Sequence, residues 1–190
     1  KIFVADGDDL EKLNSLVRQT KVILSTAGPF ARYSDLLVQA CVNQGTHYTD
    51  ITGENHWVKT LIDRHNDNAN LKGIRIIPSC GYDSIPSDIG TLFAVSQFEK
   101  PVKRVDLFQE WSGEASGGTI ETAFSMGKLT KEMRDPFLLN PENSTSEEQR
   151  KNSKDEMRIE KIEELDAWSG MFVMAAGNTR VVRRSAALME

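Results

Sequence analysis

The chain has 190 residues, of which 39% are hydrophobic and 27% charged, and its net charge is −5. This composition is typical of a soluble globular protein and excludes the disordered and disulfide-stapled classes. The acidic balance argues against nucleic acid as a partner, because nucleic-acid binding uses a basic surface. No apolar run reaches the roughly 20 residues that a membrane-spanning helix needs.

The chain opens on an apolar run at residues 2–5, which predicts a buried strand that leads into a helix. Asp8 is the candidate N-cap of that helix, and Glu11 lies three residues later, as in a capping box. Leucine and valine residues at helical spacing then continue to Val17. The chain therefore begins with a β-α unit.

Three more β-α units follow at short spacing, each an apolar strand followed by a helical pattern. Gly45 and Gly73 are placed to end two of the helices, and Ser87 is placed to begin the last one. The expected strands are 22–24, 48–51 and 74–77, and the expected helices are about 34–45, 57–73 and 87–95.

Short strands that alternate with helices indicate an α/β fold with a parallel sheet covered on both faces. We expect a Rossmann-like doubly wound sheet over residues 1–100 that lacks its first β-α-β segment. Beyond a boundary near Lys100, residues 101–190 are expected to form part of a second, α+β domain. There the alternation of residues 102–111 predicts a strand with one exposed side, and a helix is expected over 117–129.

Residues 141–164 contain 13 charged residues out of 24, so they predict a mobile insertion or an exposed charged helix. Near the end of the chain, Arg180, Arg183 and Arg184 are expected to be solvated on a helix, although they could also meet a phosphate or an acidic lipid surface.

In an open parallel sheet, ligands bind beyond the carboxyl ends of the strands, where helix N-termini and loop amides converge. Small residues in these loops would let a cofactor approach the backbone closely. The alternative is that they are only the turns that any β-α unit needs. The four loops are 6–8, 26–30, 50–54 and 79–86.

Three motifs in this order, TAGPF, ACVNQGTHYTDITGE and PSCGYDSIPSDIG, lie within residues 1–98. Together they resemble the saccharopine dehydrogenase-like oxidoreductase family, which includes the trans-acting enoyl reductases of lipid biosynthesis. The resemblance implies a nicotinamide-dependent oxidoreductase with NAD or NADP as cofactor, a Rossmann domain and a second α+β domain that contributes to the substrate cleft.

The resemblance also implies roles for particular residues. Asp6 would lie near the adenine, and Tyr82, Asp83 and Ser84 would face the nicotinamide end. Gly81 is a further expected cofactor-binding residue. The loop after the second expected strand would line the pyrophosphate and nicotinamide side, through Thr26, Ala27, Gly28, Pro29 and Phe30. Two features of the family are absent: the G-x-G-x-x-G loop, and the residue that selects between NAD and NADP.

Reduction also needs a proton donor, and Tyr82 or Asp83 is favoured because both follow the last strand of the expected sheet. Asp50, Glu54 and His47 are the other titratable residues expected near the cleft. For Asp83 and Asp50 there is a structural alternative, in which the carboxylate caps a helix or accepts loop amides.

The cysteines and histidines do not indicate a metal site. Cys41 follows the apolar rhythm of its helix and is expected in the core, and a small buried thiol is also the commoner role for Cys80. The histidines are nine residues apart, whereas zinc ligands on one helix lie three or four apart.

Two functions follow. The first is an NAD(P)-dependent oxidoreductase that acts on a lipid-linked or small carbonyl or enoyl substrate; the second is a non-catalytic binding or assembly protein on a Rossmann scaffold. An exposed strand edge would make the chain marginally stable, aggregation-prone or homodimeric. The family resemblance suggests an intracellular site, at the mitochondrion or at a lipid droplet or membrane surface.

Overall fold

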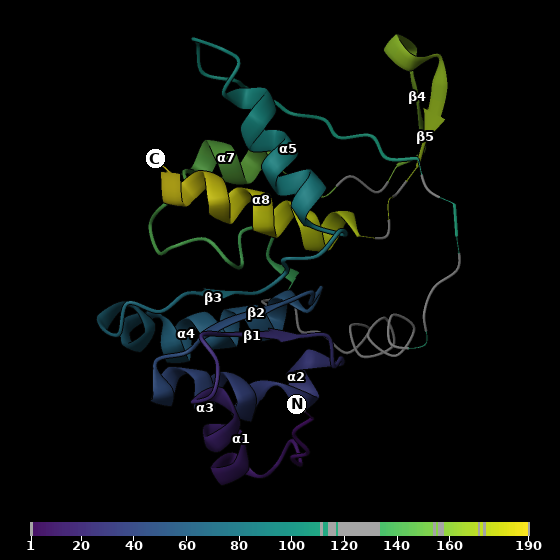
Figure 1. Cartoon of the computed structure of the whole chain (residues 1–190). Coiled ribbons are helices and arrows are strands. Elements are labelled where there is room, and N and C mark those ends of the chain that lie inside the picture. The colour runs from purple at the N-terminus through teal and green to yellow at the C-terminus, as the bar shows by residue number, and fades with distance from the viewer. Residues whose placement is uncertain are drawn as a thin grey trace. The chain divides into compact units, whose positions relative to one another are not determined.

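The structure is a computed structural model that describes residues 2–110, 112–113, 117, 134–153, 155, 158–170, 172 and 174–189. The chain divides into two compact units, drawn in Figure 1. The first unit consists of Lys1–Tyr82 and Ala115–Thr130, and the second of Asp83–Glu114 and Lys131–Glu190. Whether independent domains meet near Lys100 stays a prediction.

The first unit holds a parallel sheet of three strands in the order β1-β2-β3. The strands predicted at 22–24, 48–51 and 74–77 are present, although the last is shorter than expected. In the register of the first two strands, Ser25 lies opposite Asp50, so both strands end at the same edge. The strands are β1 Val22–Ser25, β2 His47–Asp50 and β3 Ile76–Ile77.

In the described part of this unit, four helices accompany the sheet: α1 Leu10–Val17, α2 Phe30–Tyr33, α3 Asp35–Gln44 and α4 Asn55–Leu71. The predicted cap of α1 is wrong by one residue. Asp9, not Asp8, is the N-cap, because its carboxylate accepts a hydrogen bond from the backbone N–H of Lys12 at 3.0 Å. Gly45 ends α3 in the left-handed conformation, as predicted.

The strand predicted at residues 2–5 does not form. Ile2 and Val4 are largely exposed, and the described sheet contains only β1, β2 and β3. An apolar run becomes a strand only when a neighbouring strand accepts its backbone hydrogen bonds, and no described strand does so here.

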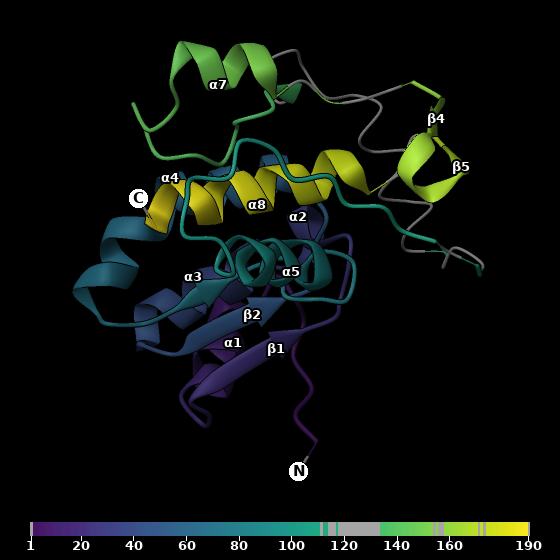
Figure 2. The same ribbon diagram turned by 90° about the horizontal axis from the view of Figure 1, so that it is seen from above.

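Among the described residues of the first unit, helices pack against one face of the sheet, and the expectation that both faces are covered stays a prediction. Ile23, Tyr48 and Ile76 pack into the core with α1, α3 and α4. Figure 2 shows the sheet from the side opposite α1 and α3. Side chains alternate between faces along a strand, so their neighbours point away from these helices. The exposed side chains are Val22 (49%), Leu24 (68%) and Ile77 (47%).

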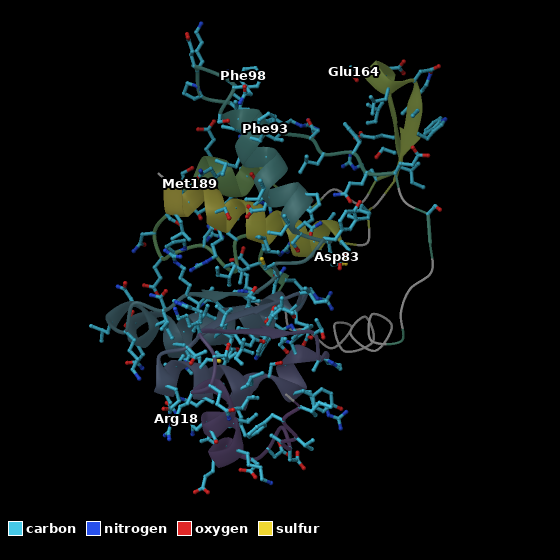
Figure 3. The ribbon with its side chains drawn as sticks, in the orientation of Figure 1. Arg18, Asp83, Phe93, Phe98, Glu164 and Met189 are labelled. Carbon is cyan, nitrogen blue, oxygen red and sulfur yellow. The ribbon has the colours of Figure 1, made fainter. Side chains whose placement is uncertain are left out.

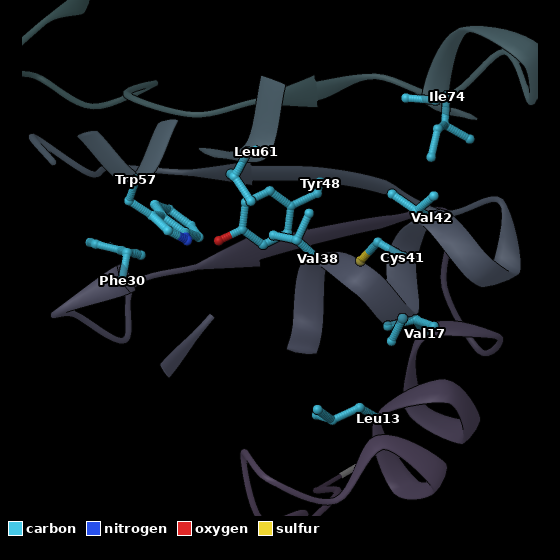
Figure 4. Packing of buried hydrophobic residues seen from close by; sticks show 12 residues of the cluster. Leu13, Val17, Phe30, Val38, Cys41, Val42, Tyr48, Trp57, Leu61 and Ile74 are labelled. Carbon is cyan, nitrogen blue, oxygen red and sulfur yellow. The ribbon is translucent and has the colours of Figure 1, made fainter. Parts of the chain in front are cut away.

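The core of the first unit lies between the sheet and these helices (Figure 4). Val17, Val38 and Cys41 are completely buried, which confirms the prediction that Cys41 is a core residue. Full burial of a side chain of this kind contributes about 1.5–3 kcal/mol. Helices α1 and α3 and the sheet are therefore held together chiefly by apolar packing.

The second unit pairs two helices, α5 Ile85–Val95 and α8 Ala175–Met189. The predicted cap Ser87 lies inside α5, and the N-cap is Ser84. Phe93 and Phe98 are exposed on and just after α5, as Figure 3 shows. The smaller elements are α7 Glu147–Asn152, the antiparallel strands β4 Glu160–Ile162 and β5 Ala167–Ser169, and the 3-10 turn η2 Glu163–Leu165.

The strand predicted over 102–111 is absent from its described part, residues 102–110. Val105 and Leu107 are exposed there, and no described strand lies beside them to complete a ladder. The helix predicted over 117–129 lies outside the described residues, apart from Gly117. In the charged segment 141–164, α7 is an exposed charged helix, one of the two predicted alternatives.

The three arginines of α8 are not solvated, contrary to expectation. The Arg180 side chain is 5% exposed; it pairs with Asp155 at 2.8 Å and donates to the Arg134 carbonyl at 2.7 Å. Arg183 donates to the carbonyls of Pro136 and Ser153, and Arg184 to that of Leu139. Carbonyls of segment 134–153 accept hydrogen bonds from these guanidinium groups, because the segment packs against α8 in the folded unit.

Candidate functional site

Three loops gather at the carboxyl edge of the sheet in the first unit. Because β1 and β2 are parallel and in register, the loops that follow them leave the sheet at one edge, as the arrowheads in Figure 2 show. The loop after β3 joins them through the contacts described below. The three loops are 26–29, 51–54 and 78–82.

Asp50, the last residue of β2, joins the second loop to the third. Its side chain is 1% exposed, and its Oδ1 accepts hydrogen bonds from the backbone N–H groups of Thr52 and Ser79, both at 3.0 Å. Its backbone carbonyl accepts from the N–H of Cys80 at 2.7 Å, and the Ser79 hydroxyl donates to the carbonyl of Thr52. The structural alternative predicted for Asp50, acceptance of loop amides, is therefore confirmed.

Glu54 joins the second loop to the first. Its backbone begins α4, whereas its buried side chain reaches the start of α2. Oε1 accepts from the backbone N–H of Phe30 at 2.7 Å, and Oε2 accepts from that of Ala31 at 3.1 Å. Its own N–H donates to the Thr52 hydroxyl at 3.1 Å. A carboxylate at the start of a helical turn is stabilised by hydrogen bonds from its free amides.

A close contact between backbone and side chain joins the second and third loops. A Cβ atom on Gly81 would lie 2.9 Å from both Cβ and Cγ2 of Ile51, which is shorter than real Cβ contacts. Only glycine therefore lets the third loop approach Ile51 this closely. We refer to Asp50, Thr52, Glu54 and Gly81, which together hold the three loops, as the loop clasp.

Burial sets the electrostatics beneath the loops. It raises the pKa of Asp50 above its ordinary value, and the charge of Glu54 adds to this shift. Burial likewise raises the pKa of the Tyr48 hydroxyl. Among the described residues, no hydrogen-bond partner reaches Asp50 Oδ2, the Tyr48 hydroxyl or the Ser34 hydroxyl, although all three are buried.

The predicted cofactor loop after β1 divides into an exposed and a buried part. Thr26, Ala27 and Gly28 are exposed at the sheet edge, so their backbone and side chains can meet a ligand. Pro29 and Phe30 are buried, and the Phe30 ring stacks on Trp57 with centroids 6.1 Å apart (Figure 4). The side chain of Phe30 therefore belongs to the core, and only its backbone lies at the loop.

The remaining predicted residues are placed as follows. Asp6 is exposed, and its carboxylate accepts from the backbone N–H of Asp8 at 3.3 Å. Tyr82, at the end of the first unit, is 89% exposed. Asp83 (Figure 3) is also exposed but belongs to the second unit, as does Ser84. The roles predicted for these residues stay predictions.

In the second unit, Asn178 of α8 is a buried polar residue that the sequence analysis did not single out. Its side-chain amide donates to the Asp83 carbonyl at 2.7 Å and to the Ser87 hydroxyl at 3.2 Å, and its Oδ1 accepts from the Ser84 hydroxyl at 3.0 Å. Ser84 is therefore engaged in the packing of α5 on α8. No local pattern could have revealed this, since 94 residues separate Ser84 from Asn178.

Cys80 is exposed, contrary to the buried position expected for it, whereas Cys41 is buried. In the described ranges, no three histidine, cysteine, aspartate or glutamate residues are grouped so that they could hold a metal ion. The helices within those ranges are all too short or too polar to cross a membrane.

Comparison with known proteins shows similarity along the whole chain to trans-acting enoyl reductases. Those of Mycobacterium ulcerans and Mycobacterium bovis are 33% identical over 208 and 205 residues. A Mycobacterium tuberculosis protein, whose name assigns it provisionally to this group, is 32% identical over 204 residues. The matches cover 100% of this chain and 49% of each relative, so the chain spans about half the length of these relatives. No family model and no solved structure matches.

Proposed function

We propose that this chain supplies part of the coenzyme and substrate site of a nicotinamide-dependent enoyl reductase built on a Rossmann-like sheet. The observation that carries the proposal is the similarity of all its residues to proteins named trans-acting enoyl reductases. The geometry agrees with it, because ligands of open parallel sheets bind beyond the carboxyl ends of the strands, where the loop clasp lies.

The exposed part of the first loop fits one portion of a nicotinamide coenzyme. Thr26, Ala27 and Gly28 offer backbone groups and small side chains to a flat ligand. The first two amides of α2 do not fit a phosphate, since Glu54 already occupies them. The coenzyme would therefore meet this loop through its nicotinamide end, and its phosphates would be held elsewhere.

When bound, a reduced nicotinamide supplies a hydride, which carries two electrons, to one carbon of the enoyl double bond. A proton must then reach the other carbon, so that the double bond becomes a single bond while the coenzyme is oxidised. Tyr82 and Asp83 are the proposed proton donors, because both are exposed and follow β3. A lipid-linked enoyl group is the proposed substrate class.

A titration of NADH and NADPH against the full-length protein, followed by nicotinamide fluorescence, tests the proposal. Ala27→Trp fills the exposed loop, so we expect it to weaken binding about tenfold or more. Lys21→Trp is the matched control, because Lys21 is exposed just before β1, at the opposite edge of the sheet. Equal binding by both variants would contradict a site at this loop.

Failure of the unaltered protein to bind either coenzyme would contradict the reductase proposal itself. The second function predicted from the sequence, a non-catalytic binding or assembly protein, would then be favoured.

A further inference from the structure

Glu54 places a negative charge beside the backbone N–H groups that follow loop 26–29. The first N–H groups of a helical turn have no acceptor within the turn. At α2 the Glu54 carboxylate accepts from two of these groups, at 2.7 and 3.1 Å. Both oxygens are engaged, so the carboxylate cannot leave without depriving the buried Phe30 N–H and the part-buried Ala31 N–H of their acceptor.

The position of Glu54 is fixed from several sides. Its side chain is 2% exposed, its N–H donates to the Thr52 hydroxyl, and its carbonyl accepts from the N–H groups of Trp57 and Val58 in the first turn of α4. The Phe30 ring, which follows the loop, stacks on Trp57. The conformation of loop 26–29 is therefore coupled to the start of α4 through Glu54.

We propose that Glu54 is a positioning residue that also sets the charge preference of this loop. By occupying the amides of α2, it holds Thr26, Ala27 and Gly28 in place and favours a cationic group over a neutral or anionic one. This inference rests on the proposed function. For a nicotinamide coenzyme, it means that the loop favours the oxidised ring, which is positively charged, over the reduced ring, which is neutral.

Two neighbouring charges bear on this preference. Asp50 lies beneath the same loops, and when it is ionised it acts in the same direction as Glu54. Arg32 of α2 is exposed, and its guanidinium lies over the Tyr33 ring at 5.0 Å. A solvated cation at the surface is screened far more than a buried carboxylate, so we expect Glu54 to dominate.

Glu54→Gln tests this inference in the full-length protein, because glutamine keeps the size of the side chain and removes its charge. The measurement is the dissociation constant of the oxidised and of the reduced coenzyme, and the quantity compared is their ratio. We expect the variant to lose about tenfold of the preference for the oxidised form. A purely structural role would weaken the binding of both forms equally and leave the ratio unchanged.

Thr46→Val is the matched control. The Thr46 hydroxyl is buried and donates to the Val17 carbonyl at 2.9 Å in the same unit, so its loss costs one buried hydrogen bond away from the loops. We expect its ratio to equal that of the unaltered protein.

The outcomes separate the two proposals. An unchanged ratio in Glu54→Gln, with coenzyme bound, would overturn the role of Glu54 and leave the proposed function standing. Binding of neither form by the unaltered protein would overturn both. A second readout uses inorganic pyrophosphate, which the unaltered protein should not bind at the backbone amides of Thr26, Ala27 and Gly28, as monitored by their NMR shifts; shifts at these amides would also overturn the inference.

Discussion

Asp50 is the residue on which the arrangement of the loops depends most directly, because its backbone and side chain both accept hydrogen bonds from the third loop. Burial raises its pKa above the ordinary 3.8. The folded state therefore holds the Asp50 proton more tightly than the unfolded state does. The stability that this group contributes is fully present below pH 3.8 and is lost as the pH rises through the folded-state pKa.

Asp50→Asn removes this titration while it keeps the Oδ1 acceptor. We expect the free energy of unfolding of the unaltered protein, minus that of the variant, to decrease as the pH rises from below 3.8 toward neutrality. Urea unfolding at a series of pH values measures the difference. Asp67→Asn, at an exposed position of α4, is the control, and a difference that stays constant with pH would refute the assignment.

Gly81→Ala probes the close approach of the third loop to Ile51. Because the new Cβ would lie 2.9 Å from atoms fixed near the backbone, we expect a loss of about 1–3 kcal/mol of stability. Gly90→Ala in α5 has open space around it, so it should be neutral or stabilising in a thermal unfolding experiment. Equal stability of Gly81→Ala and the unaltered protein would show that the loop relaxes.

Single residues were predictable where the chemistry is local. Gly45 could be placed as a helix end and Cys41 as core, since each depends on its own helix. The role of Glu54 was missed, because its partner amides lie 23 and 24 residues earlier and meet it only in the folded sheet. The only available signal was a glutamate that follows Thr52 and Gly53 at a helix start. That pattern is compatible with many other roles for the carboxylate.

At the scale of elements, helix α8 depends on segment 134–153 as much as the segment depends on the helix. Arg180 and Arg183 together donate to three carbonyls and pair with Asp155. The Arg183 guanidinium also lies over the Phe137 ring at 5.0 Å. Arginine suits this arrangement because its planar fork donates in several directions at once.

Arg180→Leu should destabilise this arrangement by about 1–3 kcal/mol, because it removes the closer of the two arginines that pair with Asp155 and leaves the Arg134 carbonyl without its donor. Hydrogen exchange should become faster over 134–153 and remain unchanged in α3. Arg180→Lys keeps the charge, so its stability should lie between that of Arg180→Leu and that of the unaltered protein. Arg158→Ala, at an exposed position, is the control. Equal hydrogen-exchange rates over 134–153 in Arg158→Ala and Arg180→Leu would contradict this role of Arg180.

Elements that carry their own signal were predictable, and elements that need a distant neighbour were not. Strands β1 and β2 and helices α3 and α4 follow from short apolar runs and helical spacing. The strands expected at 2–5 and 102–111 show equally clear patterns, but pattern alone does not supply a hydrogen-bonding partner. The arginines of α8 were expected in solvent because they are charged, but the packing of segment 134–153 against the helix partly buries them.

At the scale of the whole molecule, the sheet of the first unit exposes one apolar face, and β1 is an edge strand among the described strands. Exposed apolar edges promote association. The association of the chain with itself stays a prediction. Leu24 of β1 is the residue expected to contribute most to that contact, since its side chain is 68% exposed.

Leu24→Lys should reduce concentration-dependent association, as measured by sedimentation velocity, because a charge on an edge strand opposes further pairing. Leu71→Lys is the matched control: Leu71 is 85% exposed, but it ends α4 and lies outside the sheet. If both variants associate as the unaltered protein does, the β1 edge is not the contact.

The most direct test of the central claim is whether the full-length protein oxidises a reduced nicotinamide coenzyme in the presence of an enoyl thioester. We expect a loss of nicotinamide fluorescence that requires the enoyl substrate and that Ala27→Trp suppresses while Lys21→Trp does not. If neither the protein nor the substrate changes the coenzyme fluorescence, the proposed reductase activity is contradicted. A non-catalytic binding protein on the same scaffold would then be favoured.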